Sequence, residues 1–100
     1  MNEVSDLANV IRKLHGVESK HVESVPVKET FQGQTVWEGV VEVFNLIGHP
    51  KAAQGYAWRY QDDDGKTQYT AVLKLPPVKS PRDAVKAAIV AKVKNEGKET

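Results

Sequence analysis

Residues 35–46, with the sequence TVWEGVVEVFNL, are the stretch that decides the fold. Valine and aromatic side chains dominate it, and these residue types favour the extended backbone of a β-strand. Side chains alternate between the two faces of a strand, so Trp37, Val41 and Val43 share an uncharged face, whereas the opposite face carries glutamates. The pattern predicts a strand whose uncharged face packs on the core.

Further strands are predicted on both sides of this stretch. Upstream, residues 21–31 are rich in β-branched residues, and Pro26 places them at an edge because proline cannot donate to a ladder. The glycine-bearing link 32–34 then makes a hairpin. Downstream, residues 52–61 alternate large rings with smaller side chains, and an Asp-Gly turn leads into a fourth strand at residues 67–75.

Amphipathic helices are predicted at the two ends of the chain. Apolar residues recur every three or four positions over residues 4–15, and Gly16 stands where a left-handed residue closes a last turn. A second helix is predicted over residues 81–95. Its start carries Ser80 as the N-cap and an acid, Asp83, three residues later.

The expected architecture is an α+β, two-layer sandwich with the element order α-β-β-β-β-α. It contains a four-stranded antiparallel meander sheet, and both helices cover the face that carries Tyr56 and Trp58. We expect one domain over residues 1–95 and a frayed tail over 96–100. An alternative stays open, in which the first helix crosses to the other face of the sheet and buries it.

Composition excludes several classes of function. The chain has 100 residues, 40% hydrophobic and 27% charged, a net charge of +1 and no cysteine, which describes one domain without disulfides or thiolate metal sites. No segment has the apolar length of a membrane span, and the N-terminus does not resemble a secretion signal, so we expect a cytoplasmic protein. The three histidines lack metal-ligand spacing, and no nucleophile or phosphate-loop motif occurs. We therefore predict no catalytic residue, no cofactor and no metal.

The second face of the sheet is the leading candidate surface for a partner. If both helices cover the opposite face, apolar side chains stay exposed here among charges, and such a patch marks an interface. We accordingly predict a non-enzymatic binding or regulatory module, with a protein partner or a second copy of the chain on this face. The predicted partner surface consists of Val36, Glu38, Val40, Glu42, Phe44, Arg59, Val72 and Lys74.

The start of the second helix supports a different function. Up to residue 73 the chain carries seven basic and ten acidic residues, whereas the remainder carries seven basic and three acidic residues. Lys79, Arg82 and Lys86 gather at the start of this helix, where the helix dipole also attracts phosphate. The alternative to phosphate binding is that these residues form an ordinary basic helix face that only contacts solvent.

Residues 40–94 resemble the double-stranded RNA-binding domain. In that family a Gly-Pro-x-His turn joins the first two strands, and this chain has Gly48, His49, Pro50 and Lys51 at a comparable place. The resemblance implies that Arg82 and Lys86 take the cationic positions that grip phosphates across an RNA groove. Binding of double-stranded RNA is therefore the alternative function.

Residues 36–44 also carry a second resemblance. Their sequence, VWEGVVEVF, is similar to a segment of small bacterial proteins of unassigned function. That similarity implies no activity.

Overall fold

The computed structural model describes residues 3–61 and 64–98 of the chain. These residues form α1 (Glu3–His15), β1 (Glu18–Phe31), β2 (Gln34–Ile47), β3 (Gln54–Gln61), β4 (Thr67–Leu73) and α2 (Pro81–Lys98). The four strands make one antiparallel sheet in the order β1-β2-β3-β4. The predicted α+β class, the meander and the order α-β-β-β-β-α are confirmed.

Local signals explain where the helices begin and end. The hydroxyl oxygen of Ser80 accepts a hydrogen bond from the Asp83 amide at 3.2 Å, and the Asp83 carboxylate in turn accepts one from the Lys79 amide at 3.1 Å. This reciprocal capping is what the sequence predicted for the start of α2. Gly16, at φ 71°, ends α1, and its amide donates to the Arg12 carbonyl at 2.8 Å.

The far end of α2 differs from the prediction. The helix continues through Gly97 to Lys98, although its end was expected near residue 95. A glycine inside a helix lowers its stability by about 1 kcal/mol relative to alanine and does not forbid it. The predicted frayed tail, residues 96–100, is therefore helical as far as residue 98, and residues 99–100 lie outside the described part of the chain.

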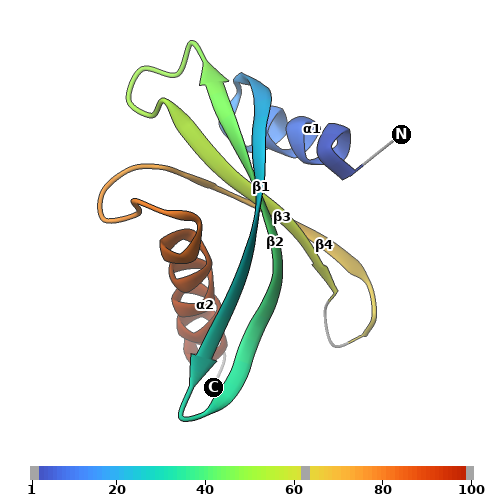
Figure 1. Ribbon diagram of the computed structural model, residues 1–100, viewed down its shortest axis with the longest axis vertical. Coiled ribbons are helices and arrows are strands. Elements are labelled where there is room, and N and C mark those ends of the chain that lie inside the picture. The colour runs from blue at the N-terminus through green and yellow to red at the C-terminus, as the bar shows by residue number, and fades with distance from the viewer. Residues whose placement is uncertain (1–2, 62–63, 99–100) are drawn as a thin grey trace.

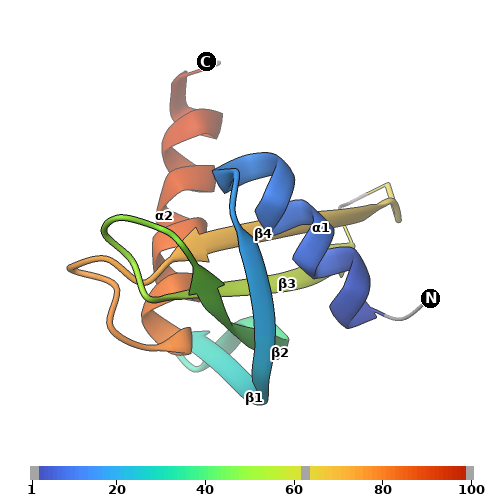
Figure 2. The same ribbon diagram turned by 90° about the horizontal axis from the view of Figure 1, so that it is seen from above.

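The two helices pack on opposite faces of the sheet (Figure 1, Figure 2). Beneath α2 lies a core that includes Val41, Tyr56, Trp58 and Val85. Beneath α1, the side chains of Leu7, Ile11, Phe44 and Ala57 form a separate buried cluster. The prediction that both helices share the ring-bearing face is thus wrong: the sheet is a middle layer between two helices, and the first helix takes the alternative position.

The physical reason is that the centre of the sheet is apolar on both faces. Residues 41–44 of β2 and 55–58 of β3 are buried without a break, although side chains in a strand alternate between faces. Continuous burial of this kind requires cover on both sides. The ring of Phe44 lies on the face opposite Tyr56. If both helices covered the Tyr56 face, the Phe44 ring would be exposed to water.

The register between β3 and β4 differs from the one that the predicted Asp-Gly turn implies. A two-residue turn at Asp64 and Gly65 would place Tyr60 opposite Tyr69, but Tyr60 pairs with Gln68 and Trp58 with Thr70. The last pair joins residues 61 and 67, so the loop is longer than two residues. A shift by one residue moves every β4 side chain to the other face.

Candidate functional site

Two valines of the predicted partner surface, Val36 and Val40, lie on a part of β2 that α1 does not cover. Val40 keeps 46% of its surface exposed, whereas Phe44, on the same face, is 1% exposed against α1. Val36, at an irregularity of the β1–β2 register, is 51% exposed. Two half-exposed valines on one strand are apolar surface available to a partner. The exposed face is therefore smaller than predicted and confined to the half of the first hairpin that is distant from α1.

Other members of the predicted surface do not belong to it. Phe44 is buried, and Val72 packs with the core under α2, on the opposite face, because of the register shift. Lys74 follows β4 and points, with Gln54, toward the end of the sheet where the β2–β3 loop lies. Of the predicted surface, Glu38 and Arg59 line one cleft, and the exposed valines Val36 and Val40 flank Glu38 along β2.

Glu42 is a buried carboxylate with a structural role. It is 5% exposed, and its Oε1 accepts hydrogen bonds from His21 Nε2 at 2.7 Å and from the Ser24 hydroxyl. The His21 ring also meets Phe44 edge to face, with 5.4 Å between centroids. A nucleophilic serine needs its hydroxyl bonded to the imidazole, whereas here serine and histidine both bond to the carboxylate. The cluster holds β1 to β2.

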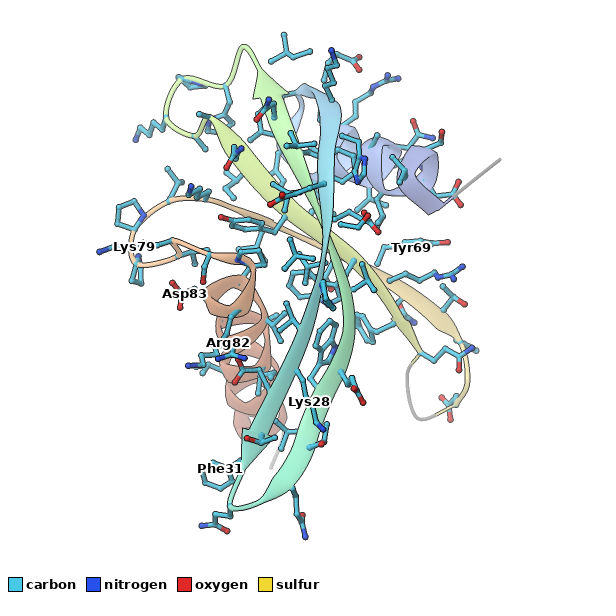
Figure 3. The ribbon with its side chains drawn as sticks, viewed as in Figure 1. Lys28, Phe31, Tyr69, Lys79, Arg82 and Asp83 are labelled. Atoms are coloured by element: carbon cyan, nitrogen blue, oxygen red, sulfur yellow. The ribbon has the colours of Figure 1, made fainter. Side chains whose placement is uncertain are left out.

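The predicted phosphate-binding residues have different surroundings in the fold. Arg82 Nε lies 3.1 Å from Glu29 Oε1, and its Nη2 lies 3.5 Å from the Lys28 carbonyl (Figure 3). Glu29 is 8% exposed, and its Oε1 accepts no aligned hydrogen bond within the described residues, so the contact is an ion pair. Arg82 thus fastens α2 to β1. Lys86 is exposed on α2, and Lys79 lines a hollow at the end of the sheet.

The two hairpins of the sheet are paired over only a short length. β1 pairs with β2 along almost all of both strands, and β3 pairs with β4 from end to end. Between the hairpins, only residues 42–45 of β2 pair with residues 54–57 of β3. Beyond these pairs the strands diverge, as Figure 1 shows. Each hairpin therefore presents an inner strand edge with no strand beside it in the described part of the chain.

A cleft occupies the space where β2 and β3 diverge. Its volume is about 510 Å³, within the range of ligand sites in proteins. We call it the interhairpin cleft, and it is lined by Trp37, Glu38, Arg59, Tyr60, Gln61 and Thr67. Glu38 and Arg59 bring opposite charges to its two sides, and both belong to the predicted partner surface. The cleft thus unites part of that surface with two open strand edges.

Two aromatic side chains, Trp37 and Tyr60, line the interhairpin cleft. The indoles of Trp37 and Trp58 meet edge to face, with 5.9 Å between centroids and an interplanar angle of 69°. Trp37 is partly exposed and packs, like Tyr60, on the edge of the core under α2. A buried tryptophan on one side and a helix behind it hold the cleft rings in place.

Sequence reasoning missed this cleft because it predicted a continuously paired sheet. The structure has 14 residues in β2 and 8 in β3, so most of β2 has no counterpart in β3, whereas the predicted ranges 35–46 and 52–61 are nearly equal in length. The alternation of side chains along the strands predicted Trp37 and Tyr60 to face the core, and both do pack against its edge while staying partly exposed. Alternation does not report where neighbouring strands separate.

Other kinds of site are not found in the described part of the chain. Residues 3–61 and 64–98 contain no group of three or more His, Asp or Glu side chains placed to hold a metal ion. Over the same residues, neither helix has both the length and the apolar character to cross a membrane. His49 is a turn residue, whose Nδ1 accepts hydrogen bonds from the amides of Lys51 and Ala52.

Comparison of the chain with protein-family models, curated proteins and solved structures finds no match. The two resemblances therefore stay predictions, and the function has to be argued from the interhairpin cleft and its surroundings.

Proposed function

We infer that the protein is a non-enzymatic binding module that takes an extended segment of a partner protein into the interhairpin cleft. The observation that carries this inference is the limited pairing of β2 with β3, which ends after four residue pairs. An open strand edge presents a row of unpaired N–H and C=O groups that pairs readily with another chain. Addition of a strand to such an edge is a common mode of peptide recognition.

The side chains around the cleft suit such a segment. Neighbouring side chains of an added strand point to opposite faces of the sheet. One set would meet the rings of Trp37 and Tyr60, and the other would lie on the half-exposed valines Val36 and Val40. The expected ligand is therefore an extended peptide with apolar side chains at successive positions, bound mainly through its backbone.

Binding of double-stranded RNA through the start of α2 has less support. The Arg82 guanidinium is already paired with Glu29, and a phosphate would have to displace that carboxylate. Lys79 lines a hollow to which neither Arg82 nor Lys86 contributes. Two of the three cations of the alternative prediction thus already have other surroundings, whereas the residues of the interhairpin cleft line one common space.

The test is selection of ligands from a displayed library of random peptides, followed by titration of a selected peptide into the full chain. We expect a peptide whose binding is lost when alternate amides on one edge are N-methylated, because methylation removes the donors that pair with β2 or β3. Methylation of the other set of alternate amides is the matched control and should leave binding unchanged. A selected peptide that tolerates both patterns would contradict strand addition.

A pair of protein variants tests where on the sheet the peptide binds. Val40 and Val22 are each 46% exposed, but only Val40 lies on the exposed face beside the cleft; Val22 lies in an irregularity of β1. Val40→Lys should weaken peptide binding at least about tenfold, and Val22→Lys should not change it. Light scattering on the same variants tests self-association: a dimer dispersed by Val40→Lys would identify a second copy as the natural occupant of this surface. A strict monomer that also selects no peptide would refute the function.

A further inference from the structure

A second hollow lies at the opposite end of the sheet from the hairpin tip Phe31. It has a volume of about 520 Å³ and opens between the β2–β3 loop and the segment that connects β4 to α2. Figure 1 and Figure 2 both show these two connections side by side. We call it the lysine hollow, and it is lined by Asn45, Lys51, Ala53, Gln54, Lys74, Pro76, Val78 and Lys79.

Three separate segments each bring one lysine to this hollow. Lys51 comes from the β2–β3 loop, Lys74 follows β4, and Lys79 precedes α2. No acidic residue lines the hollow, and within the described residues none of the three ammonium groups is paired with a carboxylate. Asp83, four residues after Lys79, uses its carboxylate to cap the Lys79 amide (Figure 3). The hollow is therefore a concentration of uncompensated positive charge.

The strand register adds polar donors to the floor of the hollow. Asn45 pairs with Gln54, and the Lys74 amide donates to the Gln54 carbonyl at 2.9 Å. Directly paired residues point to the same face, so these three side chains, which all line the hollow, form one row across the sheet. The Gln54 amide group donates to Asn45 Oδ1 at 3.0 Å, and its own oxygen lies 3.4 Å from Lys74 Nζ. Because these bonds occupy acceptor oxygens, the row offers mainly donors to a ligand.

Hydrogen bonds hold both walls of the hollow in place. His49 Nδ1 accepts from the Lys51 amide at 3.1 Å and from the Ala52 amide at 2.9 Å, which fixes the loop that carries Lys51. On the other wall, the Val78 amide donates to the Leu75 carbonyl at 2.8 Å, next to Lys79. A site whose walls are already ordered loses less entropy when a ligand binds.

We propose that the lysine hollow binds a small organic molecule that carries several phosphate groups, of the size of a nucleotide. Multiple ammonium groups without a competing acid select a multiply charged anion. The volume greatly exceeds that of a bare phosphate, and Ala53, Pro76 and Val78 supply an apolar wall for an organic body. The cations converge on one hollow and do not follow a line, which favours a compact ligand over an RNA duplex. This site shares no residue with the interhairpin cleft, and it stands whether or not the cleft binds a peptide.

The test is calorimetric titration of the full chain with ATP at low salt, with inorganic tripolyphosphate and adenosine as separate probes. We expect ATP to bind more tightly than tripolyphosphate, and adenosine to bind more weakly than both, because charge and the apolar wall act together. The site variant is Lys51→Gln, Lys74→Gln and Lys79→Gln combined. The matched control combines Lys13→Gln, Lys28→Gln and Lys86→Gln, three exposed lysines outside the hollow. Both have the same net charge.

We expect the affinity for ATP to fall at least about tenfold in the site variant and less than about twofold in the control. Thermal unfolding checks that both variants fold. If the site variant does not fold, the single variant Lys74→Gln replaces it. Equal losses in the two variants would mean nonspecific attraction and would overturn the proposal. So would equal affinity for ATP and adenosine, or a gel shift of duplex RNA that the control variant abolishes and the site variant does not.

Discussion

The indole of Trp37 covers Gly39: a Cβ atom at position 39 would lie 3.0 Å from Cη2 and 3.2 Å from Cζ2 of that ring. Both distances are tighter than nine in ten real Cβ contacts, so a side chain at this position requires the indole to give by a few tenths of an ångström. Gly39 pairs with Val27 of β1, and its missing side chain is what allows Trp37 to lie along the inner edge of β2. The position of Trp37 in the interhairpin cleft thus depends on a glycine two residues away.

We expect Gly39→Ala to lower the free energy of unfolding by about 1 kcal/mol, because the added methyl group overpacks against the indole. Urea unfolding gives the change in stability, and tryptophan fluorescence reports the displaced ring. In Trp37→Phe the atoms that approach position 39 are gone, so Gly39→Ala should then cost much less. Equal costs in the two backgrounds would show that the ring does not limit position 39.

Substitutions at Glu42 and Glu38 test whether the buried carboxylate of Glu42 stabilises the fold. Both lie on the same face of β2, but Glu42 is 5% exposed and bonded to His21 and Ser24, whereas Glu38 is exposed. Glu42→Ala removes the common acceptor of two donors, and we expect a loss of about 3 kcal/mol of unfolding free energy. Glu38→Ala should change it by less than about 0.5 kcal/mol. Similar effects at the two positions in urea unfolding would contradict the structural role.

Arg82 should matter for stability, and Lys86 should not. Without its guanidinium, the carboxylate of Glu29 stays buried and unpaired, so we expect Arg82→Gln to lower the free energy of unfolding by about 1 kcal/mol after allowance for the exposed side of the pair. Lys86→Gln should change it by less than about 0.5 kcal/mol. A cycle with Glu29→Gln separates the pair from its surroundings. No coupling in that cycle would exclude the fastening role of Arg82.

The raised pKa of the buried Tyr56 phenol predicts that the protein loses stability in alkaline solution. Burial raises the pKa of Tyr56 above its ordinary value of 10.0, and the charges of Asp83 and Glu23 raise it further. The folded protein therefore favours the neutral phenol, and this contribution is complete below the pKa of the unfolded chain and is lost as the pH rises through the folded pKa. We expect the free energy of unfolding to fall as the pH rises above about 9 and through the folded pKa of Tyr56, and the fall to be smaller in Tyr56→Phe.

Tyr69→Phe is the control for this pH dependence, because Tyr69 is 39% exposed at the surface of β4 (Figure 3). Its alkaline slope should equal that of the unmodified protein. If Tyr56→Phe also keeps that slope, the phenol of Tyr56 does not contribute to the loss.

Local chemistry made much of the fold predictable from the sequence. The alternating rings Tyr56, Trp58 and Tyr60 identified β3, and the hydroxyl of Ser80 with the acid Asp83 identified the start of α2. These features act within a few residues, so the sequence contains all that determines them. The side of the sheet that each helix takes could not be read in this way, since β2 is apolar on both faces around Phe44.

The candidate site was predicted only in part, for a different physical reason. Glu38 and Glu42 have the same spacing and the same face, yet one borders the cleft and the other is buried, because bonding partners from β1 decide between them. The point where β2 and β3 separate depends on the twist of the whole sheet and on α2 behind it. Lys74 was assigned to the sheet face, whereas the end of β4 carries it to the lysine hollow.

Amide hydrogen exchange along β2 and β3, followed by NMR with and without a peptide selected from the displayed library, tests the central claim most directly. The limited pairing predicts that alternate amides within residues 36–41 of β2, or within 58–61 of β3, exchange readily in the free protein. Addition of the peptide should protect those amides and leave the outer edges of β1 and β4 unchanged. Protection confined to an outer edge, or to α1, with no change in the interhairpin cleft, would contradict the account.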